Sequence, residues 1–349
     1  MPRLRRSDCA APGISRRGRG RGHEFLDPGG ERIDDPEVLE RIHALAIPPA
    51  WRDVWICTDP RGHLQATGFD AAGRKQYLYH ERWRAHRDRQ KFDSMIAFGH
   101  ALRGLRGRVK RDLRLPADEP GSADRRLSRE RVLACAVRLL DVGFFRIGSE
   151  DYAERNESFG LTTMLRKHVT VAGEQLVFDF PAKSGQRRVQ AIADGDALEL
   201  VRELKRRRSG SQLLAYREDG HWHELDAEEV NDYIKRHSGS FTAKDFRTWN
   251  ATVLAAVALA APDAAAQTRA ARERRVGTAI KTVAAYLGNT PAVCRASYVD
   301  PRVLDRYRDG ETIAPAPEQL SGDGPDLADA RVRRKVETAV LDLLDHAPG

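Results

Sequence analysis

Three short segments in the first quarter of the chain constrain its fold most. Residues 54–58, 63–67 and 75–80 are short segments that contain strand-forming residues, and turn-forming runs of Asp, Pro, Ala and Gly separate them. Short segments bounded by turn formers are typical of strands, and such turns join neighbouring strands into hairpins. This region therefore predicts a small antiparallel β-sheet.

The last of these segments carries a basic and aromatic strip. Lys75, Tyr77 and Tyr79 lie on one face of the predicted strand, because successive side chains of a strand point to opposite sides. The strip fits either a contact surface for a partner or the core of the small sheet. The sequence pattern by itself leaves both interpretations open.

Most of the remaining chain has helical periodicity. Residues 81–110 form a very basic amphipathic stretch, and apolar side chains recur at helical spacing in residues 132–140. Between later helical segments, residues 168–171, 175–180 and 187–192 alternate as strands. The pattern predicts an α+β protein.

Turn formers and acidic residues at 115–121 indicate a domain boundary. We expect a small N-terminal antiparallel β-sheet domain with a basic helix at residues 23–112. A larger, mainly α-helical domain that contains a small β-hairpin sheet follows at residues 113–349. Residues 1–22 are rich in Arg and Gly, cannot bury a core, and predict a disordered arm.

The charge of the chain indicates a polyanionic partner. The net charge is +8 and the pI is near 9.4. With 32% charged residues and no long apolar run, nucleic acid fits better than a membrane. The four cysteines lack the spacing of a metal site, which indicates reduced thiols in a cytoplasmic protein.

Three basic residues are candidates for anion binding. Arg146 directly follows two phenylalanines, and it fits either a buried structural arginine or an anion ligand on a rigid collar. Lys183 stands in the turn at residues 181–185, where most lysines are only solvated. Arg247 follows a capping-box pattern at Thr242 and borders an apolar helix face, where an arginine needs an anionic partner.

The stretch at residues 287–301 is the candidate centre of the chain. A helix is predicted to end at Gly288 and Asn289, and a short one to begin with Thr290 as its N-cap. Tyr298 then lies near the end of that short helix. It fits either a half-buried structural aromatic or a nucleophile served by the basic residues elsewhere in the chain.

Taken in order, these residues resemble the type IB DNA topoisomerases, in particular the small bacterial enzymes similar to the poxvirus topoisomerase. The matching motifs cover about residues 23–310. They are Gly73 to His80, Gly143-x-x-Arg146-Ile147-Gly148, Asn156 to Thr163, Lys183-Ser184-Gly185, Lys244-Asp245-Phe246-Arg247-Thr248, Leu287-Gly288-Asn289 and Ser297-Tyr298. Two positions depart: Ala182 replaces a glycine common in the family, and Asn289 replaces the histidine of the poxvirus enzyme.

The resemblance implies a catalytic set made of Arg146, Lys183, Arg247, Asn289 and Tyr298. Its chemistry suits the residue types. A phenol is a weak nucleophile at neutral pH, and attack on a phosphodiester builds negative charge that arginine forks can bind. A lysine can give the proton that a 5′ hydroxyl leaving group needs. An asparagine can donate a hydrogen bond to a phosphate oxygen.

The resemblance also implies contacts with double-stranded DNA by Lys75, Gln76, Tyr77, Tyr79, Tyr152 and Lys244. The two domains are expected to close as a clamp on the duplex, in a monomer that works in the cytoplasm at the nucleoid. Neither a metal nor another cofactor is expected, and the chain has no ATP phosphate loop.

Two alternatives remain at this stage. A tyrosine site-specific recombinase uses the same phosphotyrosine chemistry, although recombinases usually have His at the position of Lys244. A DNA-binding protein without enzymatic activity is the second.

Overall fold

The computed structural model describes residues 3–20, 22–114, 126–148, 157–261, 268–313, 327 and 329–345. The chain forms two compact units, Met1–Lys91 and Phe92–Gly349. The division lies inside helix α2 (Glu81–Leu113), earlier than the boundary predicted after residue 112. It lies there because Met95 and Phe98 of this helix already belong to the hydrophobic core of the second unit. The turn-rich segment 115–121 is outside the described residues.

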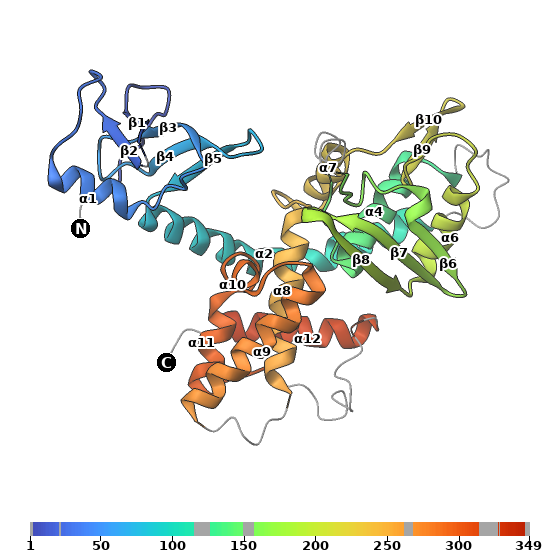
Figure 1. The fold of residues 1–349 in the computed structure, drawn as a ribbon. Coiled ribbons are helices and arrows are strands. Elements are labelled where there is room, and N and C mark those ends of the chain that lie inside the picture. The colour runs from blue at the N-terminus through green and yellow to red at the C-terminus, as the bar shows by residue number, and fades with distance from the viewer. Residues whose placement is uncertain are drawn as a thin grey trace. The chain divides into compact units, whose positions relative to one another are not determined.

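The described residues of the first unit form a five-stranded antiparallel sheet with helix α1 and the beginning of α2 (Figure 1). Its elements are β1 (Ile14–Arg19), β2 (Gly22–Leu26), α1 (Pro36–Ala44), β3 (Arg52–Ile56), β4 (Leu64–Phe69) and β5 (Lys75–Tyr79). The strands are ordered β2-β1-β3-β4-β5, which confirms the predicted meander of the last three. Ile14, Ile42 and Ile56 lie in its small core.

The prediction of a disordered arm at residues 1–22 is wrong for residues 14–19, which form β1 between β2 and β3. Ile14 is buried opposite Ile56 in the sheet register. The arginines within β1 have partners: Arg17 Nε lies 2.6 Å from Glu24 Oε1, and Arg16 Nη2 donates to the carbonyl of Trp51 at 2.6 Å. The Arg and Gly content wrongly predicted disorder for this strand, because the partners of its arginines lie on the next strand or farther along the chain.

The structure of β5 decides whether its aromatic strip is a surface or part of the core of the small sheet. Tyr77 and Tyr79 are 47% and 39% exposed, so they are not core residues. Their rings stack with 6.2 Å between centroids, and Lys75 Nζ lies 5.9 Å from the Tyr77 ring centre. Gln76 is half-buried and donates to Asp70 Oδ2 at 2.9 Å. The strip is therefore a surface feature of the first unit.

The second unit combines helices with two small antiparallel sheets. Its helices are α4 (Arg129–Gly143), α6 (Gly195–Lys205), α7 (Ala227–Ser238), α8 (Ala243–Ala260), α9 (Arg269–Leu287), α10 (Pro291–Ser297), α11 (Pro301–Asp309) and α12 (Ala330–Asp345), with 3-10 turns η1 (Arg166–His168) and η2 (Lys183–Gly185). Its strands are β6 (Val169–Ala172), β7 (Gln175–Ala182), β8 (Gln186–Ile192), β9 (Ala215–Glu218) and β10 (His221–Glu224). The architecture confirms the α+β prediction.

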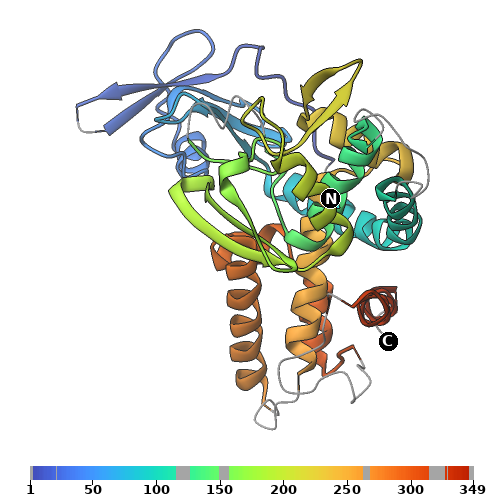
Figure 2. The same ribbon diagram turned by 90° about the vertical axis from the view of Figure 1, so that its right-hand side faces the viewer.

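Helices α8 and α9 run side by side through this unit, and α10 and α11 pack on them (Figure 2). The sheet β6-β7-β8 lies near the end at which α8 begins (Figures 1 and 2). Trp249 of α8 is fully buried and anchors the helix in the core. None of the helices in the described ranges has the length and apolar character needed to cross a membrane.

The final helix α12 is joined to the core by buried charges. Arg106 Nε lies 2.8 Å from Asp141 Oδ2, and Arg106 Nη1 lies 2.6 Å from Glu337 Oε2 on α12. Arg333, also on α12, lies 2.8 Å from Asp141 Oδ1. Burial alone would raise the pKa of Asp141, but the charges of Arg106 and Arg333 hold this pKa well below its usual value. Helix α12 is thus an integral part of the second unit.

Candidate active site

The segment that carries Arg146 is shaped by the end of α4. The helix ends at Phe144, which adopts the left-handed conformation with φ of 54°. Gly143 is required before it, because a Cβ there would come within 2.3 Å of Phe145 Cε2. Phe145 is fully buried and meets Phe178 edge-on with 4.8 Å between ring centroids. Arg146 therefore directly follows a rigid, well-packed turn.

Arg146 is held against the end of α9. Its Nη2 donates to Asn289 Oδ1 at 2.6 Å and to the Gly288 carbonyl at 3.1 Å. Gly288 is the left-handed C-cap of α9, with φ of 60°, a conformation that glycine adopts without strain. The predicted end of this helix is confirmed. The cap also brings Asn289 to an arginine 143 residues earlier in the chain.

Arg247 lies in the first turns of α8 and is only 3% exposed. It donates to the carbonyls of Phe144 and Leu287, the latter at 2.9 Å. Its guanidinium carbon lies 5.2 Å from the ring centre of Tyr298. Burial, and after it the charge of Arg146, lowers the pKa of Arg247 to about 10, although Tyr298 acts in the opposite direction.

Tyr298 is the half-buried C-cap of α10, as the sequence predicts, and Thr290 caps the start of that helix. The adjoining main chain is held against α8 by Thr252, whose single hydroxyl proton is shared between the Thr248 carbonyl at 2.9 Å and the Tyr298 carbonyl at 3.3 Å. The same hydroxyl accepts from the Asp300 N–H at 3.1 Å. Thr252 is fully buried. Sequence reasoning missed it, because a threonine within an alanine-rich helix gives no local signal of a distant partner.

Arg188 on β8 is a third arginine at this place, also missed from the sequence. It donates to the carbonyls of Tyr286 at 2.9 Å, Gly143 at 3.3 Å and Phe144 at 3.4 Å. Burial, followed by the charges of Arg247 and Arg146, lowers the pKa of Arg188 to about 10. Its position on the inward face of an alternating strand was the available signal.

Lys183 opens the turn η2 between β7 and β8 and is exposed at the hairpin tip, where the sequence predicts it. The hairpin also accommodates alanine at position 182, where the family commonly has glycine. Ala182 has φ of −101° and ψ of 179°, an extended conformation open to any residue. The left-handed conformation of the turn is at Gly185, with φ of 71°.

The predicted DNA contacts are distributed over both units. Lys244 is exposed at the start of α8, one turn before Arg247. Lys75, Gln76, Tyr77 and Tyr79 are on β5 of the first unit. Tyr152, and Asn156 of the matching motif, lie outside the described residues.

The arginine cluster, defined here as Arg146, Arg188 and Arg247, has the electrostatic character of an anion site. Arg188 and Arg247 donate to main-chain carbonyls, which carry no formal charge. Two buried donor atoms, Arg247 Nε and Asn289 Nδ2, lack a hydrogen-bond partner among the described residues. A buried donor left unpaired costs about 1–3 kcal/mol. An anion bound here would satisfy such donors and offset the repulsion between the arginines.

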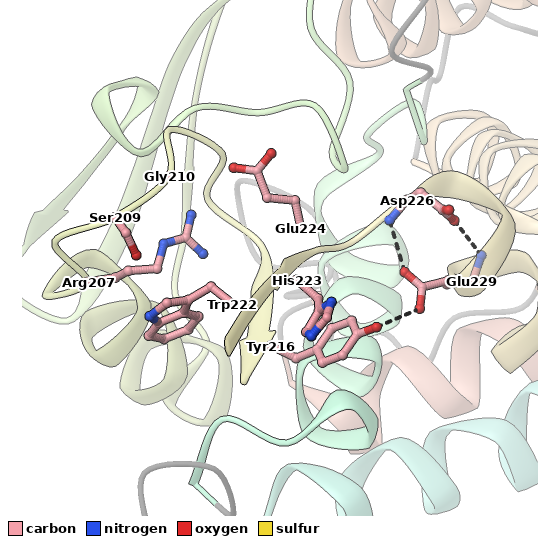
Figure 3. Close-up of a pocket in the computed structure, with 9 residues that line it drawn as sticks. All are labelled: Arg207, Ser209, Gly210, Tyr216, Trp222, His223, Glu224, Asp226 and Glu229. Atoms are coloured by element: carbon pink, nitrogen blue, oxygen red, sulfur yellow. Dashed lines mark hydrogen bonds between the residues drawn. The ribbon is translucent and has the colours of Figure 1, made fainter. Parts of the chain in front are cut away.

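A separate pocket of about 700 Å³ lies elsewhere in the second unit (Figure 3). Its residues are Arg207, Ser209, Gly210, Tyr216, Trp222, His223, Glu224, Asp226 and Glu229. Glu229 accepts from the Asp226 N–H at 3.2 Å and from the Tyr216 hydroxyl at 3.4 Å, so these groups satisfy one another.

Comparisons with known proteins identify the family. Residues 80–316 match the family described as "Eukaryotic DNA topoisomerase I, catalytic core", and residues 22–70 match "Bacterial DNA topoisomerase IB, N-terminal domain". The chain belongs to the type IB DNA topoisomerases, and it is an enzyme whose substrate is DNA.

Two viral relatives agree with this assignment. The chain is 31% identical over 281 residues to DNA topoisomerase 1B of Acanthamoeba polyphaga mimivirus, covering 77% of this chain and 80% of the relative. It is 21% identical over 292 residues to DNA topoisomerase 1B of Vaccinia virus (strain Copenhagen), covering 82% and 86%.

Proposed function

We propose that this topoisomerase relaxes supercoiled DNA through a transient bond between Tyr298 and a 3′ phosphate of one strand. The free strand swivels and is then religated, and the energy of the broken bond is retained in the phosphotyrosyl link. The observation that carries the proposal is the placement of Arg247 beside the Tyr298 ring, at 5.2 Å, within the arginine cluster.

Arg146 and Arg247 are assigned to the negative charge of the transition state. Attack of a phenol on a phosphodiester places charge on the non-bridging oxygens, and planar guanidinium groups bind such oxygens with two parallel hydrogen bonds. Neighbouring cations also favour the ionised, nucleophilic form of a phenol. The unpaired Nε of Arg247 is a donor that a phosphate oxygen can satisfy.

Asn289 is assigned the role of a hydrogen-bond donor. Its Oδ1 accepts from Arg146 at 2.6 Å, which leaves Nδ2 as the donor atom. Nδ2 has no partner among the residues that the structure describes. A donor that meets developing charge on a phosphate oxygen stabilises the transition state more than the ground state.

Lys183 is assigned to the leaving group. As the bond between the tyrosine oxygen and phosphorus forms, the bond from phosphorus to the 5′ oxygen breaks. Lys183 gives a proton to that oxygen, and the phenolic proton passes to solvent. Religation reverses each transfer.

The proposal extends to the two units. Lys75, Gln76, Tyr77 and Tyr79 of the first unit, with Lys244 and Tyr152 of the second, are assigned to contacts with double-stranded DNA. The exposed, stacked pair Tyr77 and Tyr79 beside Lys75 supports this assignment. We further propose a monomer that closes as a clamp on DNA at the nucleoid and needs neither ATP nor a metal.

One experiment tests the reaction. The purified protein and its Tyr298→Phe variant are incubated with supercoiled plasmid in EDTA without ATP, and the products are separated by gel electrophoresis. Relaxation by the wild type alone is expected, since the substitution removes only the phenolic oxygen. Equal relaxation by the variant, or loss of wild-type relaxation in EDTA, contradicts the proposal. Exchange of strands between two DNA sites would instead indicate a recombinase.

A further inference from the structure

Arg188 connects three segments that deliver different residues of the site. Its guanidinium donates to Tyr286 at the end of α9, just before Asn289. It also donates to the carbonyls of Gly143 and Phe144, just before Arg146. Arg188 itself is on β8, five residues after Lys183. One side chain thus joins the hairpin of Lys183 to the two segments that carry Asn289 and Arg146.

The neighbouring contacts support the same attachment. Gln190 lies on the same face of β8 as Arg188, and its Nε2 donates to the Gly143 carbonyl at 2.8 Å. Phe180, which is opposite Arg188 in the sheet register, packs against Phe145 with 6.1 Å between ring centroids. The inner face of the hairpin is therefore docked on the turn that precedes Arg146.

The Phe144 carbonyl is shared by two arginines. It accepts from Arg247 and from Arg188, the latter at 3.4 Å. Phe144 holds the left-handed conformation, with φ of 54°, which a residue with a side chain rarely adopts. This uncommon conformation fixes the carbonyl between α8 and β8.

We propose that Arg188 is a positioning residue that sets the hairpin tip, and with it Lys183, against Arg146 and Arg247. The inference rests on the proposed role of Lys183 as the proton donor. Arg188 acts through its three carbonyl contacts and does not itself touch the phosphate. Lysine cannot replace it, because one ammonium group cannot reach three carbonyls on two separate segments in the planar geometry of a guanidinium.

The test measures covalent-complex formation in a single turnover. The DNA is a duplex with a cleavage site first mapped on plasmid, and Arg188→Ala and Arg188→Lys are compared with wild type. Misplacement of a reacting group by about 1 Å costs about 100-fold in rate. We expect both variants to cleave about 100-fold more slowly, with DNA affinity close to that of the wild type. A rate near wild type for Arg188→Lys would show that only charge is needed and overturn the proposal.

A second substrate separates positioning of Lys183 from loss of structure. It carries sulfur in place of the 5′ bridging oxygen. A thiol has a pKa of about 8.5, so its thiolate leaves without a proton donor. We expect this substrate to restore cleavage in Lys183→Ala and equally in both Arg188 variants. Restoration in Lys183→Ala but not in the Arg188 variants overturns the role of Arg188. No restoration in Lys183→Ala overturns the proposed function of Lys183 instead.

Arg187→Ala is the matched control. Arg187 is the preceding residue of β8 on the outer face, where its Nε lies 2.7 Å from Asp179 Oδ1. Its removal is expected to leave cleavage of both substrates unchanged. If thermal denaturation shows that Arg188→Ala is unfolded, Arg188→Met is used in its place. Methionine keeps an unbranched side chain next to Phe145, whose ring centre lies 5.9 Å from the guanidinium carbon of Arg188.

Discussion

Arg146 and Asn289 are joined by a hydrogen bond of 2.6 Å, from Nη2 of the arginine to Oδ1 of the asparagine. The bond orients the amide, because the oxygen is occupied and the nitrogen remains as the donor. It also links the end of α4 to the end of α9, so a change at Asn289 affects both the donor and the placement of Arg146.

Replacement of Asn289 tests the donor role. Loss of such a donor costs about 3 kcal/mol in the transition state, or about 100-fold in the cleavage rate. We therefore expect Asn289→Ala to slow cleavage strongly without abolishing it. Asn289→Asp keeps an oxygen for Arg146 but has no N–H and adds a negative charge, so it is expected to be at least as slow. Single-turnover cleavage measures both, and wild-type rates in either variant would exclude the role.

Thr252→Val removes, at nearly constant volume, the hydroxyl that accepts from the Asp300 N–H and shares its proton between the Thr248 and Tyr298 carbonyls. Leaving the buried Asp300 N–H unpaired is expected to lower the free energy of unfolding by about 1–3 kcal/mol. Cleavage should also slow, because the nucleophile is less firmly held. Urea denaturation and single-turnover cleavage measure the two effects. Thr252→Ser keeps the hydroxyl and serves as the control, and equal effects of Val and Ser would contradict the explanation.

The ion pairs of Asp141 are expected to make a pH-dependent contribution to the free energy of unfolding. Its pKa in the folded state is below the value of about 3.9 that an unfolded aspartate has. Its contribution is therefore fully present above the unfolded pKa and is lost as pH falls toward the folded one. Asp141→Asn leaves Arg106 and Arg333 without this charge, which should cost about 3–5 kcal/mol near pH 7.

The measurement for Asp141 is urea denaturation of wild type and Asp141→Asn between pH 7 and pH 3. The difference between them should be constant near neutral pH and shrink below about pH 4. Comparing the two proteins at each pH removes the contributions of other carboxylates. A difference that does not change with pH would contradict the assignment.

Lys75→Ala tests the surface strip of the first unit. Removal of one phosphate contact is expected to weaken DNA binding at all sequences and to reduce the slope of log K against log salt by about 1. Binding titrations at several salt concentrations measure this. Arg74→Ala is the control, because Arg74 is already paired with Asp70 at 2.9 Å and should change the slope less. Equal slopes for wild type and Lys75→Ala would remove Lys75 from the interface.

Several features of this protein were determined by local sequence alone. The strands β3 to β5, the capping box at Thr242 and Asp245, and the short helix that ends at Tyr298 all follow from patterns within a few residues. The order of the motifs was enough to predict the family, which the comparisons confirm. Such features are predictable because caps, turns and strand alternation depend on hydrogen bonds and burial among near neighbours.

Only the tertiary structure decided which distant residues meet. The alternation of β8 places Arg188 on the inward face, and Thr252 lies in an alanine-rich helix, but neither pattern names a partner. In the structure Arg188 joins β8 to the ends of α4 and α9, and Thr252 holds the loop after α10. Arg16 and Arg17 likewise lie in a sheet strand, where the Trp51 carbonyl and the Glu24 carboxylate accept hydrogen bonds from their side chains. A charged side chain looks the same in the sequence whether it is solvated or paired, and packing between distant segments makes that difference.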